Sequence, residues 1–241
     1  MTDELIYILI GSKSIGEEET WVYRSEQLLF DKGKPVSIII RNYTANDFDE
    51  MIDIQSECFP PPFPSELWWN KEQLTNHVTL FPEGALCVEV DGKLAGSLTG
   101  VCVDFDPAHP SHTWAEITDK GYITNHNPKG NTLYIVDISV RPSYRSLGLG
   151  KIMMQSMYHV VIEKGLDRLL GGSRMPGYHK YAHQLKAADY LKAVLTGQLK
   201  DPVITFLLKC GRLPIAVIEN YLEDEESLNY GVLMEWKNPF K

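Results

Sequence analysis

A strand, a glycine-bearing loop and a helix follow one another between residues 133 and 164, and this order constrains the fold most. Residues 133–140 are largely apolar and rich in β-branched side chains, and Pro142 follows them, which predicts a buried strand. From Gly150 to Lys164 apolar residues recur near helical spacing, so we expect a helix that starts at the glycines. The first N–H groups of a helix lack partners within it and lie at the positive end of its dipole. The sequence therefore predicts a phosphate site between the strand and the helix.

The spacing of the glycines separates the known kinds of phosphate loop. A Walker loop is excluded because Arg145 stands where its first glycine is required and Ile152 stands where Ser or Thr is required. A dinucleotide fingerprint is excluded because Met153 occupies the position of its third glycine. What is left is the pattern Arg-x-x-Gly-x-Gly over residues 145–150, with Val140 five residues before the arginine.

This pattern resembles the pyrophosphate loop of the GNAT superfamily of N-acetyltransferases, where the loop holds the diphosphate of coenzyme A. The order of expected elements from about Val36 to Lys241 is similar to the whole GNAT fold. The resemblance implies an α/β (α+β) fold with a mixed central sheet flanked by helices and with extra N-terminal strands. The other reading of the glycines is a turn between a strand and a helix that binds no ligand.

Further motifs resemble one GNAT subgroup, which also occurs fused to nitrilase-like amidase domains. They are residues 171–178, Asp201-Pro202, Asn220-Tyr221-Leu222 and Trp236.

Composition and charge limit the partners. The chain has 241 residues, of which 44% are hydrophobic and 23% charged, as expected of one main domain with an extension. The formal net charge is −9, and no block of Lys and Arg stands out, so nucleic acid and anionic membranes are not expected partners. An acidic surface favours a cationic amine instead. No apolar run approaches the roughly 18 to 20 residues that span a membrane, so we expect a cytoplasmic protein.

We expect two parts in the chain. Residues 1–35 form an N-terminal extension, with apolar patches at 5–10 and 21–23, whose strands pack on the main domain or on a partner subunit. Residues 36–241 form the GNAT-like acetyltransferase domain. Its expected helices are 48–59, 66–80 capped by Ser65, 114–120, 150–164, a helical insertion in 179–200, and 203–209. Its expected strands are 36–41, a hairpin of 85–90 and 94–103 around Asp91-Gly92, 133–140, 166–170, 213–221 and 230–236.

Histidines gather in two segments. His109, His112 and His126 lie in a long polar stretch, which we expect to be a loop that covers or shapes the substrate side. His109 and His112 are expected to be solvent-exposed. His179 and His183 are expected one turn apart on one helix face. Neither group has the accompanying ligands of a known metal motif, so no metal is expected.

The resemblance implies a cofactor site and its co-substrate, acetyl-CoA. Main-chain groups of Ile138, Ser139 and Val140 would take the pantetheine arm, as an added strand edge would. The pyrophosphate would lie on residues Arg145, Ser146, Leu147, Gly148, Leu149, Gly150 and Lys151.

The implied reaction is direct attack of a neutral amine on the acetyl thioester, which needs a base for the ammonium proton. Asp137 is the candidate base, and a buried structural aspartate is the alternative reading. Tyr134 lies on the same strand, but the two positions alternate, so their side chains cannot face the same side.

The usual family acid is a tyrosine, and Leu207 stands at the matching position. The thiolate is therefore expected to take its proton from Tyr178, Tyr221 or water, or to leave unaided. Arg174 either binds a substrate carboxylate or pairs with an acid of the protein.

These expectations describe an acetyl-CoA-dependent N-acetyltransferase that acts on an amine of a small molecule or peptide. The alternative is a noncatalytic acyl-CoA-binding or regulatory module. Exposed sheet edges and the N-terminal strands also suggest a homodimer.

Overall fold

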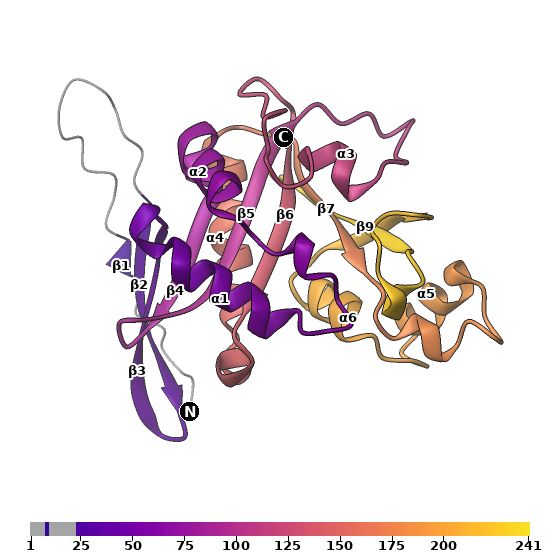
Figure 1. Cartoon of the computed structure of the whole chain (residues 1–241), viewed down its shortest axis with the longest axis horizontal. Helices are drawn as coiled ribbons and strands as arrows, with labels where there is room; N and C mark the ends of the chain where they lie inside the picture. The colour runs from indigo at the N-terminus through magenta and orange to yellow at the C-terminus, as the bar shows by residue number, and fades with distance from the viewer. Residues whose placement is uncertain (1–7, 10–22) are drawn as a thin grey trace. The chain divides into compact units, whose positions relative to one another are not determined.

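The computed structural model describes residues 8–9 and 23–241 (Figure 1). The chain divides into two compact units. Unit 1 comprises Met1–Pro60, Ser65–Gly100 and Asp137–Val160, and unit 2 comprises Pro61–Pro64, Val101–Val136 and Val161–Lys241. Most of the expected apolar patches at 5–10 and 21–23 lie outside the described residues. Within the described part of the chain, no helix is both long and apolar enough to cross a membrane.

The strands of unit 1 form an antiparallel series. Its order is β1 (Ile8–Leu9), β2 (Arg24–Asp31), β3 (Lys34–Asn42), β4 (Ala85–Val90) and β5 (Lys93–Val103, up to Gly100 in this unit). Each of the turns β2–β3 and β4–β5 contains a glycine with positive φ, +79° at Gly33 and +77° at Gly92, as two-residue hairpins require. The predicted Asp-Gly hairpin is present.

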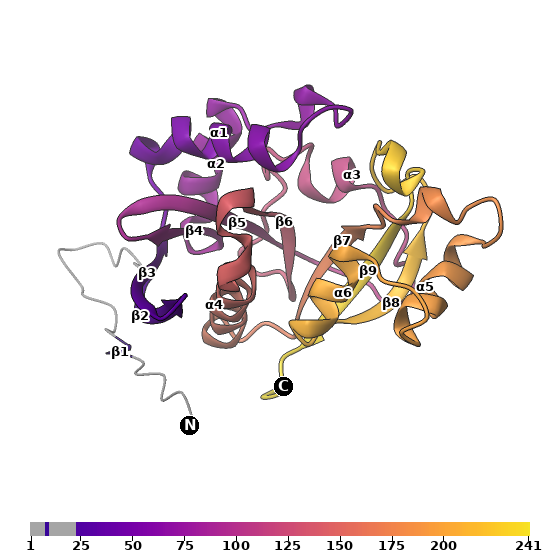
Figure 2. The same ribbon diagram turned by 90° about the horizontal axis from the view of Figure 1, so that it is seen from below.

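Helices cover both faces of the unit 1 strands, as Figure 2 shows for α1 (Phe48–Cys58) and α2 (Lys71–Leu80) on one face and α4 (Leu149–Glu163) on the other. Apolar side chains of these helices and strands are buried between them, and they account for the periodicity in the sequence. Fully buried examples are Ile38, Ile40, Met51, Ile54, Leu74, Met153 and Met157.

The expected helix 66–80 is wrong in its first turn. Residues Ser65–Leu67 form a separate 3-10 turn, and α2 begins only at Lys71. Asn70 caps α2, because its side chain accepts the Gln73 N–H at 2.9 Å and the Gln73 side chain in turn accepts the Asn70 N–H. This reciprocal capping box satisfies the N–H groups of Asn70 and Gln73, which lie at the helix start and have no carbonyl partner within α2.

Unit 2 has a mixed set of strands. The start of β6 (Thr132–Val140) pairs in parallel with β7 (Arg168–Arg174) over Thr132–Tyr134. β7 then pairs antiparallel with β9 (Gly231–Lys237), and β9 with β8 (Leu213–Ile218). The predicted mixed α/β architecture is confirmed.

Three helices belong to unit 2: α3 (Trp114–Thr118), α5 (Ala187–Leu195) and α6 (Pro202–Lys209). Asp201 caps α6 by accepting the N–H groups of Val203 and Ile204 at 3.0 and 2.9 Å. Its other oxygen accepts the hydroxyl of Tyr190 at 2.9 Å and the N–H of Gly177 at 3.1 Å. One buried carboxylate thus joins the start of α6, helix α5 and the turn after β7.

The predicted strand 166–170 is too short at its C-terminal end. β7 continues to Arg174 because residues 171–174 pair with β9. The predicted strand ends before Gly171 and Gly172, but in the structure these glycines lie within β7 and make room for a buried ring. A Cβ on Gly172 would lie 2.1 Å from Cζ of Tyr221.

Candidate active site

The predicted phosphate loop lies in unit 1, between β6 and α4. A 3-10 segment, Pro142–Leu147, leads to Gly148, whose φ of +72° lies in the left-handed region. No atom lies within 4 Å of the point where a Cβ on Gly148 would be placed, so the loop is open there. Helix α4 begins at Leu149 with no acidic residue in its first turn. No acidic side chain of the first turn therefore opposes the binding of an anion at this helix start.

Two cations belong to this loop. Arg145 and Lys151 are both exposed, and Arg145 donates from Nε to the Val140 carbonyl at 3.2 Å. Arg141, in contrast, is held by the protein, because it donates to the Leu94 carbonyl at 3.0 Å and pairs with Glu57. A helix start with two exposed cations and no acid in its first turn suits a diphosphate.

Asp137 is the centre of a polar cluster in unit 1. Its Oδ2 accepts hydrogen bonds from Gln55 Nε2 and from Ser139 Oγ, each at 2.8 Å. Gln55 Nε2 also donates to Ser139 Oγ at 3.1 Å. Gln55 lies on α1 and is only 3% exposed, so a buried amide of a neighbouring helix holds the carboxyl of β6.

Burial raises the pKa of Asp137 from its ordinary value of 3.8 to about 6, although the hydrogen bonds from its neighbours act in the opposite direction. The negative charge of Asp137 in turn contributes to a raised pKa of Cys58 and of Tyr43, for which burial is the larger cause. A carboxyl with a pKa near 6 is ionised at neutral pH and accepts a proton more readily than an ordinary aspartate does.

Tyr134 belongs to a different cluster, in unit 2, that the sequence did not predict. Its hydroxyl lies 2.9 Å from His112 Nε2 and 3.0 Å from the hydroxyl of Tyr221, and it accepts the N–H of Gly172 at 2.9 Å. A tyrosine hydroxyl has one donor and two acceptor sites, so these three partners use all of them. Burial raises the pKa of Tyr134 to about 12.

The expectation that His109 and His112 are solvent-exposed is wrong for His112. His109 is exposed and pairs with Asp106. His112 is half-buried beside Tyr134, and His126 is half-buried and accepts the N–H of Cys102 at 3.2 Å. No sequence pattern connects His112 with Tyr134, because the two residues are 22 positions apart.

The burial of His112 predicts a pH dependence of stability. Burial lowers the pKa of His112 below its ordinary value of 6.5, so the unfolded chain binds this proton more readily than the folded protein does. His112 should therefore reduce stability as the pH falls below about 6.5. Urea denaturation should show a smaller loss of stability between about pH 7 and about pH 5 for His112→Asn than for the wild type.

The exposed His183 provides the control, since His183→Asn should leave the pH dependence of the wild type unchanged. A His112→Asn curve parallel to the wild-type curve would show that the imidazole is not desolvated in the folded protein.

Comparison with known proteins decides the family. Residues 48–182, more than half of the chain, match the model of the acetyltransferase (GNAT) family. Over 215 residues the chain is 55% identical to "Uncharacterized N-acetyltransferase YkwB" of Bacillus subtilis (strain 168), covering 89% of this chain and 95% of that protein. The chain belongs to the acetyltransferase (GNAT) family. The predicted class of enzyme, an N-acetyltransferase, is thereby confirmed.

A second relative of this acetyltransferase is longer. "Probable hydrolase YhcX" of Bacillus subtilis (strain 168) is 39% identical over 202 residues, which cover 83% of the acetyltransferase but 39% of the relative. Among solved structures, the GphF GNAT-like decarboxylase in complex with isobutyryl-CoA matches with a TM-score of 0.71 and 24% identity, over 83% of the acetyltransferase and 98% of that chain. This structural match supports the fold. Membership of the subgroup that also occurs fused to nitrilase-like amidases stays a prediction.

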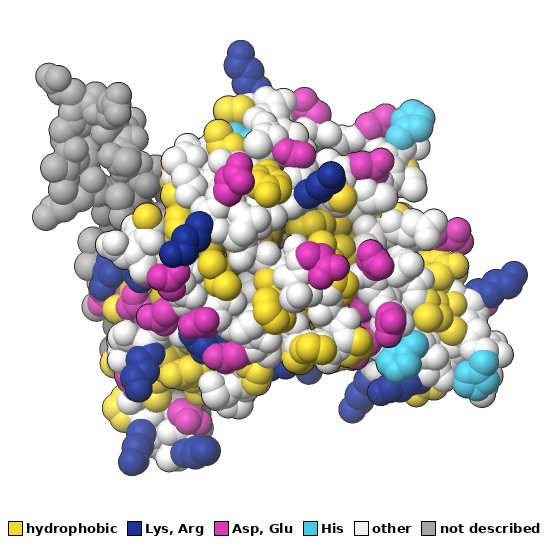
Figure 3. Space-filling model, in the orientation of Figure 1, with side chains coloured by type: hydrophobic (Ala, Val, Ile, Leu, Met, Phe, Trp, Pro, Cys, Tyr) yellow, Lys and Arg dark blue, Asp and Glu magenta, His cyan; other side chains and the backbone are white. Residues whose placement is uncertain are grey.

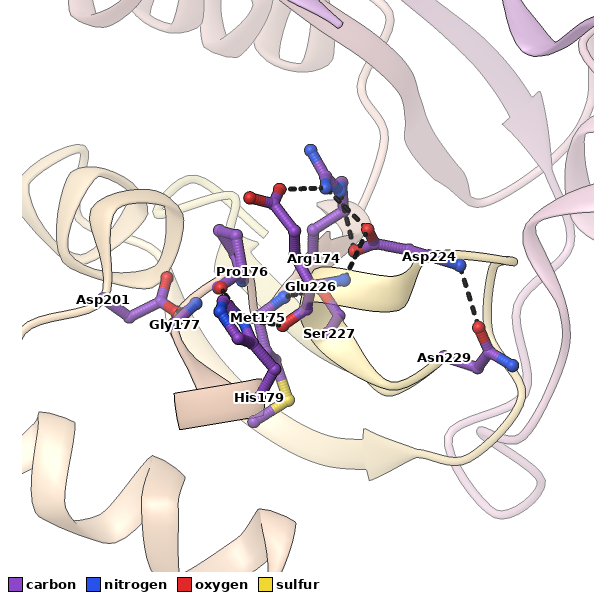
Figure 4. Close-up of polar contacts among 10 residues, drawn as sticks. All are labelled: Arg174, Met175, Pro176, Gly177, His179, Asp201, Asp224, Glu226, Ser227 and Asn229. Atoms are coloured by element: carbon purple, nitrogen blue, oxygen red, sulfur yellow. Dashed lines mark hydrogen bonds and ion pairs between the residues drawn. The ribbon is translucent and has the colours of Figure 1, made fainter. Parts of the chain in front are cut away.

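Arg174, expected to bind a substrate carboxylate or to pair with an acid, is paired in the acetyltransferase. Its guanidinium donates to both oxygens of Asp224, at 2.9 and 2.7 Å, and to Glu226 at 2.8 Å (Figure 4). Asp224 is 4% exposed, whereas its acidic neighbours Glu223, Glu225 and Glu226 are exposed. The ion pairs hold the 224–227 turn against the end of β7, where Ser227 Oγ accepts the Met175 N–H at 2.8 Å.

The two tyrosines expected as acids are engaged as well. Tyr178 is buried and donates to the Leu185 carbonyl at 3.2 Å, and the buried Tyr221 bonds to Tyr134. Leu207 is buried in α6 and supplies no proton.

The second expected histidine pair is not on one helix face, because His179 lies in a 3-10 turn and α5 begins only at Ala187. Among the described residues, no group of three or more His, Cys, Asp or Glu side chains is arranged to hold a metal ion. On the face shown in Figure 3, Lys and Arg side chains are dispersed among acidic ones and do not gather in a patch.

Proposed function

We propose that this chain transfers an acetyl group from acetyl-CoA to an amine of a small molecule or peptide, with the coenzyme A diphosphate bound by residues 145–151. The loop between β6 and α4 is the main support for this proposal. Its glycine at φ +72°, the start of α4 without an acid, and the exposed Arg145 and Lys151 together supply an anion site.

Family resemblance extends this site along β6. The main chain of Ile138, Ser139 and Val140 would lie beside the pantetheine arm. In the structure the Val140 carbonyl accepts from Arg145 Nε and from Cys58 Sγ, both at 3.2 Å. Arg145 would therefore bridge the strand end and the diphosphate. The acetyl thioester of the co-substrate supplies the group that is transferred.

Asp137 is the proposed general base. It lies in the same unit as the loop, is ionised at neutral pH, and would take a proton from the ammonium form of the acceptor. Because Leu207 has no hydroxyl and Tyr178 and Tyr221 are engaged within the protein, we propose that the departing thiolate takes its proton from water.

The proposal specifies the acceptor by its chemical class, an amine. The net charge of −9 favours a cationic amine over an anionic one at long range. A homodimer stays a prediction that sedimentation or light scattering would test.

The cofactor is tested by calorimetric titration of coenzyme A into the wild type and two variants of Gly148. Asn and Asp both tolerate the left-handed conformation and have nearly the same size, so Gly148→Asn and Gly148→Asp differ chiefly in one negative charge. The added carboxylate also favours a helix N-terminus, so the Asp variant should fold. We expect Gly148→Asp to bind coenzyme A at least about tenfold more weakly than Gly148→Asn does, a difference of about 1.4 kcal/mol.

Equal affinities of the two variants would place the diphosphate elsewhere. Competition by ATP or NAD as strong as the binding of coenzyme A would instead indicate a general nucleotide site.

Catalysis is tested separately by release of free thiol from acetyl-CoA with a panel of amines. Release above the rate without acceptor is expected, and its absence with tight coenzyme A binding would indicate a noncatalytic acyl-CoA-binding module. Isobutyryl-CoA as a second donor would show whether a longer acyl group is accepted.

A further inference from the structure

We propose that Gln55 is a positioning residue for the base: its amide, with Ser139, holds one carboxylate oxygen of Asp137 and leaves the other to take the proton. This inference rests on the proposed function, because it assigns a partner to the proposed base. Gln55 lies on α1, far from Asp137 in sequence, and no motif identifies it.

The hydrogen bonds of the cluster form a closed triangle. Gln55 Nε2 donates to Asp137 Oδ2 at 2.8 Å and to Ser139 Oγ at 3.1 Å. Ser139 has a single hydroxyl proton, which it donates to Asp137 Oδ2 at 2.8 Å. The amide and the hydroxyl therefore both donate to the same oxygen of Asp137.

These hydrogen bonds determine which carboxylate oxygen of Asp137 accepts a proton. Because Oδ2 already accepts two hydrogen bonds, a proton placed on Oδ2 would point at donors and would displace one of them. Oδ1 receives neither of these two bonds, so it is the oxygen that the triangle leaves to accept the proton of an ammonium group. The buried amide therefore fixes both the orientation of the carboxylate and the atom that receives the proton.

The same donors set the ionisation of the base. Hydrogen bonds from Ser139, from Gln55 and from the backbone N–H of Ile138 favour the charged form of Asp137 and counteract the effect of its burial. The other titratable groups that respond to the charge of Asp137 are Cys58 of α1 and Tyr43 after β3, and both have raised pKa values. Among these described neighbours, Asp137 alone titrates between about pH 5 and pH 8.

The experiment compares Gln55→Leu with the wild type by two measurements. Carbon-13 NMR of labelled aspartate carboxyls follows the titration of Asp137 without any substrate, and the Asp137→Asn spectrum identifies its resonance. Loss of the amide donor should raise the pKa of Asp137 by about one pH unit. In kinetics, the acidic limb of kcat/KM should move to higher pH by the same amount, with kcat about tenfold lower and KM for acetyl-CoA nearly unchanged.

Two further variants complete the test. Ser139→Ala removes the second donor to Oδ2 and should also raise the pKa of Asp137. This variant provides the test if Gln55→Leu does not fold. Ser56→Ala changes the adjacent position of α1, where the hydroxyl bonds only to the Asp53 carbonyl, and should leave the titration unchanged.

A folded Gln55→Leu or Ser139→Ala protein in which Asp137 titrates at the wild-type pH would overturn the role of the triangle. That outcome is distinct from failure of the proposed function, which would show as absence of coenzyme A binding in the wild type.

Discussion

Replacement of Asp137 by asparagine should abolish most acetyl transfer and, at the same time, make the protein more stable at neutral pH. Asparagine has nearly the same shape and can still accept hydrogen bonds from Gln55 and Ser139, but it cannot take a proton from an ammonium group. Removal of a general base lowers kcat by about a hundredfold to ten-thousandfold. Binding of coenzyme A should be retained, because the diphosphate loop is unchanged.

The gain in stability follows from the raised pKa of Asp137. Its pKa is about 6 in the folded protein against an ordinary 3.8, so the folded state favours the protonated form. The stabilising contribution is present below about pH 4 and is lost as the pH rises through about 6. At neutral pH the ionised carboxyl destabilises the fold by up to about 3 kcal/mol, a penalty that the neutral amide avoids.

Urea denaturation at several pH values measures this effect. The difference in stability between Asp137→Asn and the wild type should grow from near zero at about pH 4 to its maximum above about pH 7. A variant that is inactive but less stable than the wild type at every pH would identify Asp137 as a structural residue, which was the other reading of the sequence.

Gly172→Ala should be severely destabilising, because its methyl group would occupy the place of the Tyr221 ring. A Cβ on Gly172 would lie 2.1 Å from Cζ of Tyr221, and a Cβ on Gly231 would lie 2.6 Å from Cγ of the same ring. The ring has little room to move, since Tyr221 N–H donates to the Asn229 carbonyl and its own carbonyl accepts the Trp114 N–H, both at 2.8 Å. Overpacking together with loss of the buried hydroxyl bonds should cost about 3 to 4 kcal/mol.

A double-mutant cycle tests the cause. In a Tyr221→Leu background the aromatic ring is gone, so the same Gly172→Ala change should cost at least about 2 kcal/mol less in urea denaturation. An equal cost in both backgrounds would mean that the β7 backbone, and not the ring of Tyr221, rejects the side chain.

The sequence alone was sufficient to predict those elements whose boundaries are determined by residues close together in the chain. The loop between β6 and α4 was predictable because a β-branched run, a proline and two glycines define a strand end and a helix start within a few residues. Asp137 was a candidate only because the resemblance places family carboxylates on this strand, and its raised pKa required knowledge of burial. Asp201-Pro202 identified the start of α6 for the same reason, since a cap and the first helical residue are adjacent.

Long-range contacts could not be predicted in this way. Gln55 and Asp137 are separated by 82 residues, and His112 and Tyr134 by 22. In each pair, the residues around one member therefore do not indicate the other member. The glycines at 171 and 172 misled the prediction of β7, because the sequence shows their lack of a side chain but not the Tyr221 ring that needs the space.

The double attachment of Asp201 has a consequence for protein engineering. This carboxylate accepts the Gly177 N–H and also caps α6. It therefore joins the two ends of the segment 178–200. Its two ends are held together independently of what lies between them. The tip of this excursion is therefore a suitable place to graft an epitope or a fluorescent label, provided that Tyr190 is kept as the third partner of the carboxylate.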